Sequence, residues 1–140
     1  MEEAFYIDSN VFIYAALNRG ETGMKARSLL QKIKTSGLNF STSALTFDEV
    51  FWKVFRERSR EDALNATKTL LLVSEIRFIP VDLQVLFLTQ SLLQKYRLDP
   101  RDAIHLACAR SKNIKNIISD DKDFDKIEGI KRIGIMEMRV

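Results

Sequence analysis

The chain has 140 residues, of which 46% are hydrophobic and 29% charged, so it can form one globular domain with a buried core. Its single cysteine, Cys108, excludes an intrachain disulfide and fits a reducing compartment. No apolar run reaches the roughly 18–20 residues of a membrane span, and the Met1-Glu2-Glu3 start lacks the basic residues of a signal peptide. We therefore expect one domain over residues 1–140, in the cytoplasm and without membrane association.

The charge balance is mildly basic, with 22 lysines and arginines, 19 aspartates and glutamates and a net charge of +3. If several acids belonged to a metal site, the remaining surface would be more basic, which suits a polyanionic substrate. An ordinary lysine-rich surface explains the same numbers, so charge alone does not distinguish the two.

Apolar runs of strand length alternate with stretches of helical apolar spacing. In chain order the predicted elements are a strand over 4–8, helices over 10–17 and 22–34, a strand over 38–42, helices over 43–58 and 60–74, a strand over 77–81, a helix over 82–96, a helix that begins at 99–100, a strand over 115–119, a short helix over 121–127 and a strand over 131–136. This alternation predicts an α/β domain whose parallel sheet has helices on both faces.

Aspartates recur where strands are expected to pass into helices, in the stretches 5–10, 101–105 and 118–124. Asp8 ends one predicted strand and Asp121 comes just after another, whereas Glu49 and Asp102 lie in register with the apolar stripes of their helices. Because the carboxyl ends of parallel strands share one edge of a sheet with the following helix N-termini, we expect these acids to converge. Converging carboxylates repel one another unless a cation lies between them.

Each acid also has a capping explanation. Asp8 and Asp121 could cap the helices that follow them. Glu49, three residues after Thr46, could complete a capping box. Asp102 could be a first-turn acid that suits the helix dipole. Taken singly these explanations are sufficient, and only the joint placement of the four acids favours a metal site.

The available ligands favour a hard cation. Carboxylate oxygens suit Mg²⁺, whereas one histidine and one cysteine cannot supply a zinc shell. A divalent ion in such a site can activate water and stabilise charge on a phosphate, so the pattern predicts metal-assisted phosphodiester hydrolysis with water as the nucleophile. No Ser-His-Asp triad, glycine-rich phosphate loop or Cys-x-x-Cys pair competes with it.

The chain resembles the PIN domain family over nearly its whole length, and within it the VapC-type prokaryotic toxins. The resemblance rests on Ile7-Asp8-Ser9-Asn10-Val11-Phe12, on Glu49 near the start of its helix, on Arg101-Asp102-Ala103-Ile104-His105-Leu106-Ala107 and on Ile118-Ser119-Asp120-Asp121-Lys122-Asp123-Phe124. It implies a three-layer α/β/α sandwich with a mainly parallel sheet of about five strands. It also implies an endoribonuclease dependent on Mg²⁺ or Mn²⁺, a homodimer, and inhibition by a small antitoxin encoded alongside.

The resemblance also assigns roles to the acids. Asp8 and Asp102 correspond to the principal metal ligands, and Glu49 and Asp121 complete the catalytic and metal-binding set, partly through water. Asp123 is the second choice for the fourth acid, beside Asp121.

Neighbouring polar residues are expected to support these acids. Asn10 and Ser119 would hold carboxylates or waters in place. Ser9 and Ser119 stand where threonine is frequent in the family, and both keep the hydroxyl group. Asp120 is expected to face solvent.

Other conspicuous residues have simpler explanations than a role in the site. His105, one helical turn after Asp102, could contact substrate or transfer a proton, but a packed or partly exposed helix residue is the simpler interpretation. The aromatic residues of the predicted helix over 43–58 could stack on bases, but core packing plus a dimer or antitoxin surface is simpler: Phe47, Phe51, Trp52 and Phe55. The basic residues near the end of that helix are interpreted as solvated: Lys53, Arg56, Arg58 and Arg60.

Two alternatives to a metal nuclease remain. A non-catalytic PIN-type module that binds RNA or a protein would not need the intact acidic set. A phosphoryl-transfer enzyme of the haloacid-dehalogenase kind would need a second aspartate two residues after Asp8, where this chain has Asn10.

Overall fold

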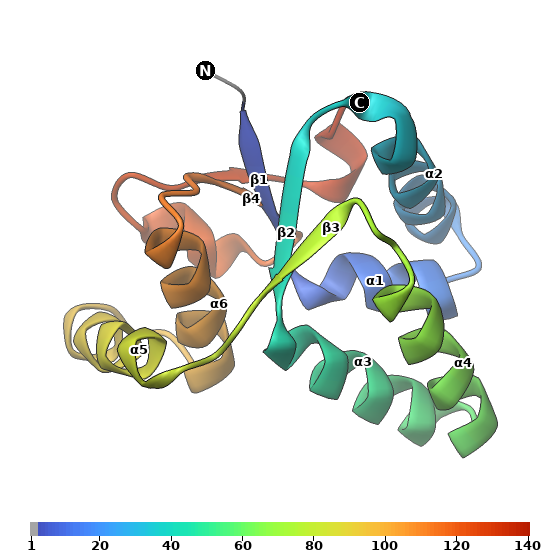
Figure 1. The fold of residues 1–140 in the computed structure, drawn as a ribbon, viewed down its shortest axis with the longest axis horizontal. Coiled ribbons are helices and arrows are strands. Elements are labelled where there is room, and N and C mark those ends of the chain that lie inside the picture. Colours follow the sequence, from blue (N-terminus) through green and yellow to red (C-terminus); the bar gives the residue numbers. More distant parts are fainter. Residues whose placement is uncertain (1–2) are drawn as a thin grey trace.

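The computed structural model describes residues 3–140, which form a parallel sheet between two layers of helices (Figure 1). The five strands are β1 (Ala4–Ile7), β2 (Asn39–Ser43), β3 (Ile76–Ile79), β4 (Asn116–Ile118) and β5 (Lys131–Ile133). Their order is β3-β2-β1-β4-β5, and every neighbouring pair is parallel. The expected α/β/α architecture is therefore confirmed.

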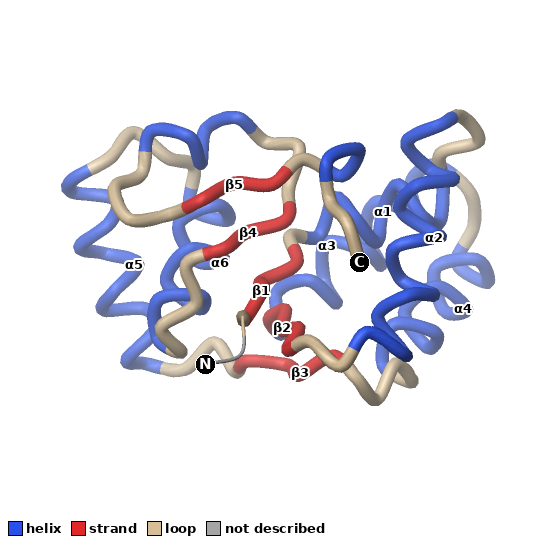
Figure 2. The backbone as a smooth tube through the Cα atoms, turned by 90° about the horizontal axis from the view of Figure 1, so that it is seen from above, coloured by secondary structure: helices blue, strands red, loops and turns tan. Residues whose placement is uncertain are grey.

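Two groups of helices cover the sheet (Figure 2). One face carries α1 (Ser9–Leu17), α2 (Glu21–Ser36), α3 (Ala44–Glu57), α4 (Arg60–Leu71) and the 3₁₀ turn η2 (Ile135–Glu137). The other face carries α5 (Leu83–Lys95), α6 (Pro100–Ser111) and the 3₁₀ turn η1 (Lys122–Lys126). Within residues 3–140 no helix combines the length and the apolar character that a bilayer span requires.

The central strand β1 contributes to both cores because successive side chains of a strand point to opposite faces. Phe5 and Ile7 pack into the core beneath α1–α4, while Tyr6 is fully buried in the core beneath α5 and α6. In β4, Ile117 and Ile118 divide between the two cores in the same way. This alternation places the Tyr6 side chain on the side of α6.

Strand order brings distant junctions together. Ile7 pairs with Ile118, so β1 and β4 end side by side, and the Asp8 backbone N–H donates to the Ile118 carbonyl over 3.0 Å. Their next residues, Asp8 and Ser119, are consequently neighbours although 111 positions separate them.

The expected elements differ from the observed ones at the C-terminal end. The last strand does not run to Met136: it ends at Ile133, and η2 follows because the N–H groups of Glu137 and Met138 both bond to the Gly134 carbonyl. The predicted short helix over 121–127 is the 3₁₀ turn η1. The stretch 101–105 does not follow a strand either, since α6 comes after helix α5.

Candidate active site

The candidate site begins with Asp8, a residue that is 4% exposed at the end of β1. Asp8 is the N-cap of α1, and its Oδ1 accepts a hydrogen bond from the Ser9 backbone N–H over 2.8 Å. Burial raises the pKa of Asp8, and the His105 charge and the Ser119 hydrogen bond only partly oppose this.

Ser119 joins the two neighbouring strand ends through one hydroxyl group. Its Oγ donates to Asp8 Oδ2 over 2.6 Å and accepts from Asn10 Nδ2 over 3.1 Å and from the Asp121 backbone N–H over 3.0 Å. One donor and two acceptor positions are the full capacity of a serine hydroxyl. The fully buried Ser119 therefore orients Asp8, Asn10 and the start of η1 together.

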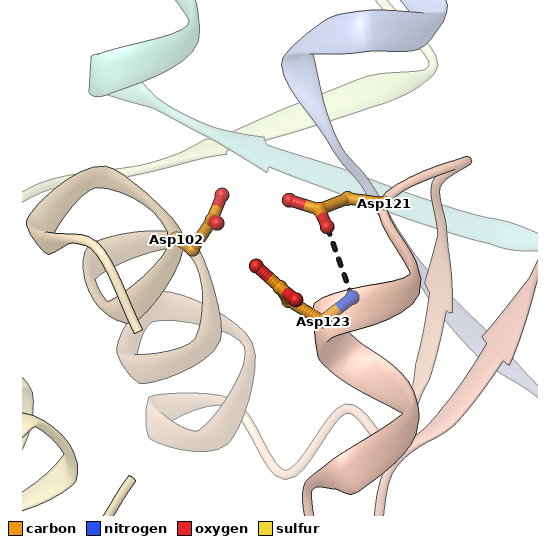
Figure 3. Close-up of side chains that lie close together, drawn as sticks. All are labelled: Asp102, Asp121 and Asp123. Atoms are coloured by element: carbon orange, nitrogen blue, oxygen red, sulfur yellow. Dashed lines mark hydrogen bonds between the residues drawn. The ribbon is translucent and has the colours of Figure 1, made fainter. Parts of the chain in front are cut away.

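Three aspartates converge beside this junction. Asp102 from the first turn of α6 faces Asp121 and Asp123 from the start of η1 (Figure 3). One carboxylate oxygen from each lies within 4.8 Å of those of the other two. Asp121 caps η1 by accepting from the Asp123 backbone N–H over 3.0 Å. Asp121 and Asp123, considered rivals from the sequence, thus lie in the same group.

Burial and neighbouring carboxylates raise the pKa of Asp102. Burial is the largest cause that raises its pKa to about 8, and the hydrogen bond and charge of Asp121 add to it. The charges of Asp99 and Asp8 raise this pKa further. Such a cluster favours either a bound proton or a bound cation.

Glu49 reaches the site from α3 through His105. His105 Nε2 lies 2.5 Å from Glu49 Oε1 and 3.5 Å from Asp8 Oδ1, while Nδ1 lies 2.5 Å from the Tyr6 hydroxyl. Burial lowers the pKa of His105, but the Glu49 hydrogen bond and the Asp8 charge raise it by more, so it lies above the usual range. The interpretation of His105 as a packed residue is confirmed, but its link to two of the acids was missed.

Acids of the site also serve at helix starts, so the capping explanation and the site explanation hold together. Asp8 and Asp121 are N-caps, and Asp102 is a first-turn acid whose N–H is capped by Asp99. The capping box proposed for Glu49 is wrong, because Ser43 is the N-cap of α3 and the Thr46 hydroxyl bonds to Thr42.

The expectation for Asp120 is also wrong. This residue is only partly exposed, and its Oδ1 accepts a hydrogen bond from the Ile135 backbone N–H over 2.9 Å. It thereby ties the end of β4 to η2, and it is not one of the three converging aspartates.

Comparison with known proteins identifies the family, because residues 5–130 match the PIN domain. The chain belongs to the PIN domain family. It is 27% identical over 130 residues to ribonuclease VapC13 of Mycobacterium tuberculosis, which covers 91% of this chain and 98% of that relative. The relative is a VapC ribonuclease, as the sequence motifs led us to expect.

Solved structures share this fold. The crystal structure of VapC20 of Mycobacterium tuberculosis, a sarcin-ricin loop cleaving toxin, has a TM-score of 0.72 at 18% identity and covers 86% of this chain and 92% of that chain. DNA-bound VapBC of Salmonella typhimurium has a TM-score of 0.73 at 18% identity and covers 96% and 99%. The PIN-like fold is therefore confirmed.

The donor set of this PIN domain fits a hard divalent cation. The converging groups offer only oxygen atoms, which suit Mg²⁺ and Mn²⁺. Asn10 Oδ1 is buried and has no hydrogen-bond partner among residues 3–140, so it can accept from hydrating water. Which of these acids are ligands stays a prediction.

The aromatic and basic residues singled out from the sequence belong to α3, its C-cap Arg58 and α4. Phe51 is partly buried, whereas the other three aromatic residues are more exposed: Phe47, Trp52 and Phe55. The basic residues of this region are all exposed, as expected for solvated side chains: Lys53, Arg56, Arg58 and Arg60. Lys53 pairs with Glu57 at 3.1 Å, and Arg56 lies over the Trp52 ring at 5.7 Å.

Proposed function

We propose that this PIN domain is a metal-dependent endoribonuclease that hydrolyses RNA phosphodiester bonds with Mg²⁺ or Mn²⁺. The observation that carries the proposal is the approach of Asp102, Asp121 and Asp123 oxygens to within 4.8 Å of one another. The VapC ribonuclease relatives support the same reaction class.

Each residue of the site has a proposed role. Asp8 and Asp102 act as principal ligands, with Glu49 and Asp121 completing the set and Asp123 beside them. Ser119 keeps both Asp8 oxygens from rotating away, since its donation to Oδ2 complements the Ser9 N–H on Oδ1. When bound, the cation supplies Lewis-acid activation of water and stabilises charge on the phosphate.

We further propose that the protein is the toxin of a VapBC-type pair in the cytoplasm, active as a homodimer and inhibited by a small antitoxin. A groove of about 460 Å³ between α1, α2, α3 and α4 offers a docking surface. Its walls carry many apolar side chains and three cations, Arg27, Lys34 and Arg58, against one acid, Asp62. This chemistry suits an antitoxin segment with apolar and acidic side chains.

The nuclease proposal is tested by incubating the purified protein with a mixed RNA panel in Mg²⁺, in Mn²⁺ and in EDTA. Wild type is expected to cleave only with metal. Asp8→Asn and Asp102→Asn are each expected to lower the cleavage rate at least about 100-fold, because each removes a carboxylate that would bind the cation. Asp48→Asn is the matched control, since Asp48 is exposed on α3 directly before Glu49; it should cleave like wild type.

Cleavage that survives EDTA, or that survives both site substitutions, would contradict the mechanism. RNA retention on a gel without metal and without product would instead favour the non-catalytic binding module. Light scattering of the purified protein tests the homodimer, and the neighbouring reading frame tests the antitoxin: a small upstream gene with a DNA-binding N-terminus supports it.

A further inference from the structure

His105 is enclosed in the interior of the domain on α6. Its side chain is 1% exposed, and both ring nitrogens have protein partners. A side chain so enclosed does not reach an RNA phosphate, so contact with substrate is excluded for His105 in this structure. Its contribution to the site must therefore pass through the groups that it touches.

The hydrogen bond from His105 to Glu49 has the same direction in both protonation states of the ring. A carboxylate only accepts hydrogen bonds, so Nε2 carries the proton whether the ring is neutral or charged. In the neutral ring Nδ1 accepts from the Tyr6 hydroxyl, and in the charged ring Nδ1 donates to the same oxygen. Tyr6 therefore holds the ring orientation in either state.

Glu49 depends on this one contact. Among residues 3–140, His105 is the only hydrogen-bond partner that the structure gives to the Glu49 side chain. A glutamate side chain has several rotatable bonds, and a partly buried one that lacks a partner samples several rotamers. His105 Nε2 also lies 3.5 Å from Asp8 Oδ1, so the same nitrogen stands beside both carboxylates.

We propose that His105 is a positioning residue that, held by Tyr6, fixes the Glu49 carboxylate beside Asp8 at the metal-binding edge of the sheet. The inference rests on the proposed function of the acidic group and assigns His105 no proton transfer. Tyr6 comes from β1, His105 from α6 and Glu49 from α3, so the hydrogen-bonded series connects three separate elements.

Mn²⁺ affinity, measured from the electron paramagnetic resonance signal of the free ion, tests this proposal. His105→Leu fills the site without a donor and is expected to weaken Mn²⁺ binding about tenfold or more. His105→Gln keeps an N–H donor and should restore part of the affinity. Tyr6→Phe removes the hydroxyl alone and should cause a smaller loss; an unchanged affinity contradicts the part assigned to Tyr6.

A double-mutant cycle separates positioning from general destabilisation. If His105 acts through Glu49, adding His105→Leu to Glu49→Gln causes little further loss of affinity. Cys108→Ala, also fully buried on α6, is the control and should lower thermal stability without changing Mn²⁺ affinity. Wild-type affinity in His105→Leu, or full additivity with Glu49→Gln, overturns the proposal.

A metal-free measurement keeps the two proposals distinguishable. His105 is the only histidine, so its ring signals in ¹⁵N-labelled protein need no assignment. We expect an Nε2 proton shifted far downfield by the hydrogen bond, and the shift should diminish in Glu49→Gln. A ring protonated only on Nδ1 overturns the positioning role, whereas a wild-type protein that shows this signal but binds no Mn²⁺ contradicts the proposed function alone.

Discussion

At the scale of single residues, the pKa of Asp102 shows how burial and neighbouring carboxylates affect the site. Its carboxyl is partly buried and faces Asp121 and Asp123, and its pKa of about 8 lies far above the usual 3.8. Without metal, the folded protein therefore keeps a proton on Asp102 at pH values where the unfolded chain has released it. Because the folded state keeps this proton where the unfolded chain has lost it, the contribution of Asp102 to stability falls as the pH rises from about 4 to 8.

Replacement of Asp102 by asparagine should remove this pH dependence. In EDTA, Asp102→Asn should be more stable than wild type, by little near pH 5 and by more at pH 8. The difference should be on the order of 1 kcal/mol, since partial exposure screens the effect, or a few degrees in melting temperature. Thermal melts from pH 5 to 8 measure it, with Asp48→Asn as the exposed control. Parallel pH profiles for wild type and Asp102→Asn would contradict the assigned pKa.

At the scale of elements, the first turn of α6 couples a helix cap to the site. Asp99 accepts from the Asp102 backbone N–H over 3.0 Å, and Pro100 occupies the favoured first helical position. The Asp99 charge also raises the pKa of Asp102. One side chain thus starts the helix and adds to the negative charge that a cation would neutralise.

These two contributions of Asp99 can be separated by substitution. Asp99→Ala should lose the cap and about 1 kcal/mol of stability, whereas Asp99→Ser should keep the cap and most of the stability. Both variants remove the charge, so both should lower the pKa of Asp102 and thus weaken the pH dependence described above. Urea denaturation at pH 5 and pH 8 measures both effects. Equal stability of the alanine and serine variants would show that the cap contributes nothing.

At the scale of the whole molecule, the groove between α1, α2, α3 and α4 is separate from the acids of the candidate site. None of the site acids lines it, so partner binding and catalysis can be altered independently. Asn65 is exposed on α4 and lines the groove, whereas the adjacent Leu64 is 51% exposed and does not.

A new carboxylate in this groove should repel an acidic antitoxin segment. Asn65→Glu is expected to weaken binding of the proposed antitoxin about tenfold, or about 1.4 kcal/mol. Leu64→Glu introduces the same side chain one residue away and should bind normally. Titration calorimetry measures both affinities, and RNA cleavage by both variants should equal that of wild type. Undiminished antitoxin binding by Asn65→Glu would place the partner elsewhere.

Local patterns were sufficient for most of the fold. Apolar runs and helical spacing predicted each strand and each α-helix to within a few residues, because burial imposes those periods directly on the sequence. The last strand was predicted too long because the apolar residues after Gly134 belong to η2, where Ile135 is buried by a turn rather than by a strand.

The sequence by itself determined which acids follow the ends of apolar strands, and hence Asp8 and Asp121, because the end of a strand is a local signal. Only the tertiary structure decided which groups meet. The parallel pairing of β1 with β4 places Ser119 against Asp8. Likewise, α6 packs against β2 and touches α3, and His105 on α6 thereby meets Tyr6 and Glu49, 99 and 56 positions away. Such contacts depend on strand order and side-chain direction, which no short stretch of sequence encodes.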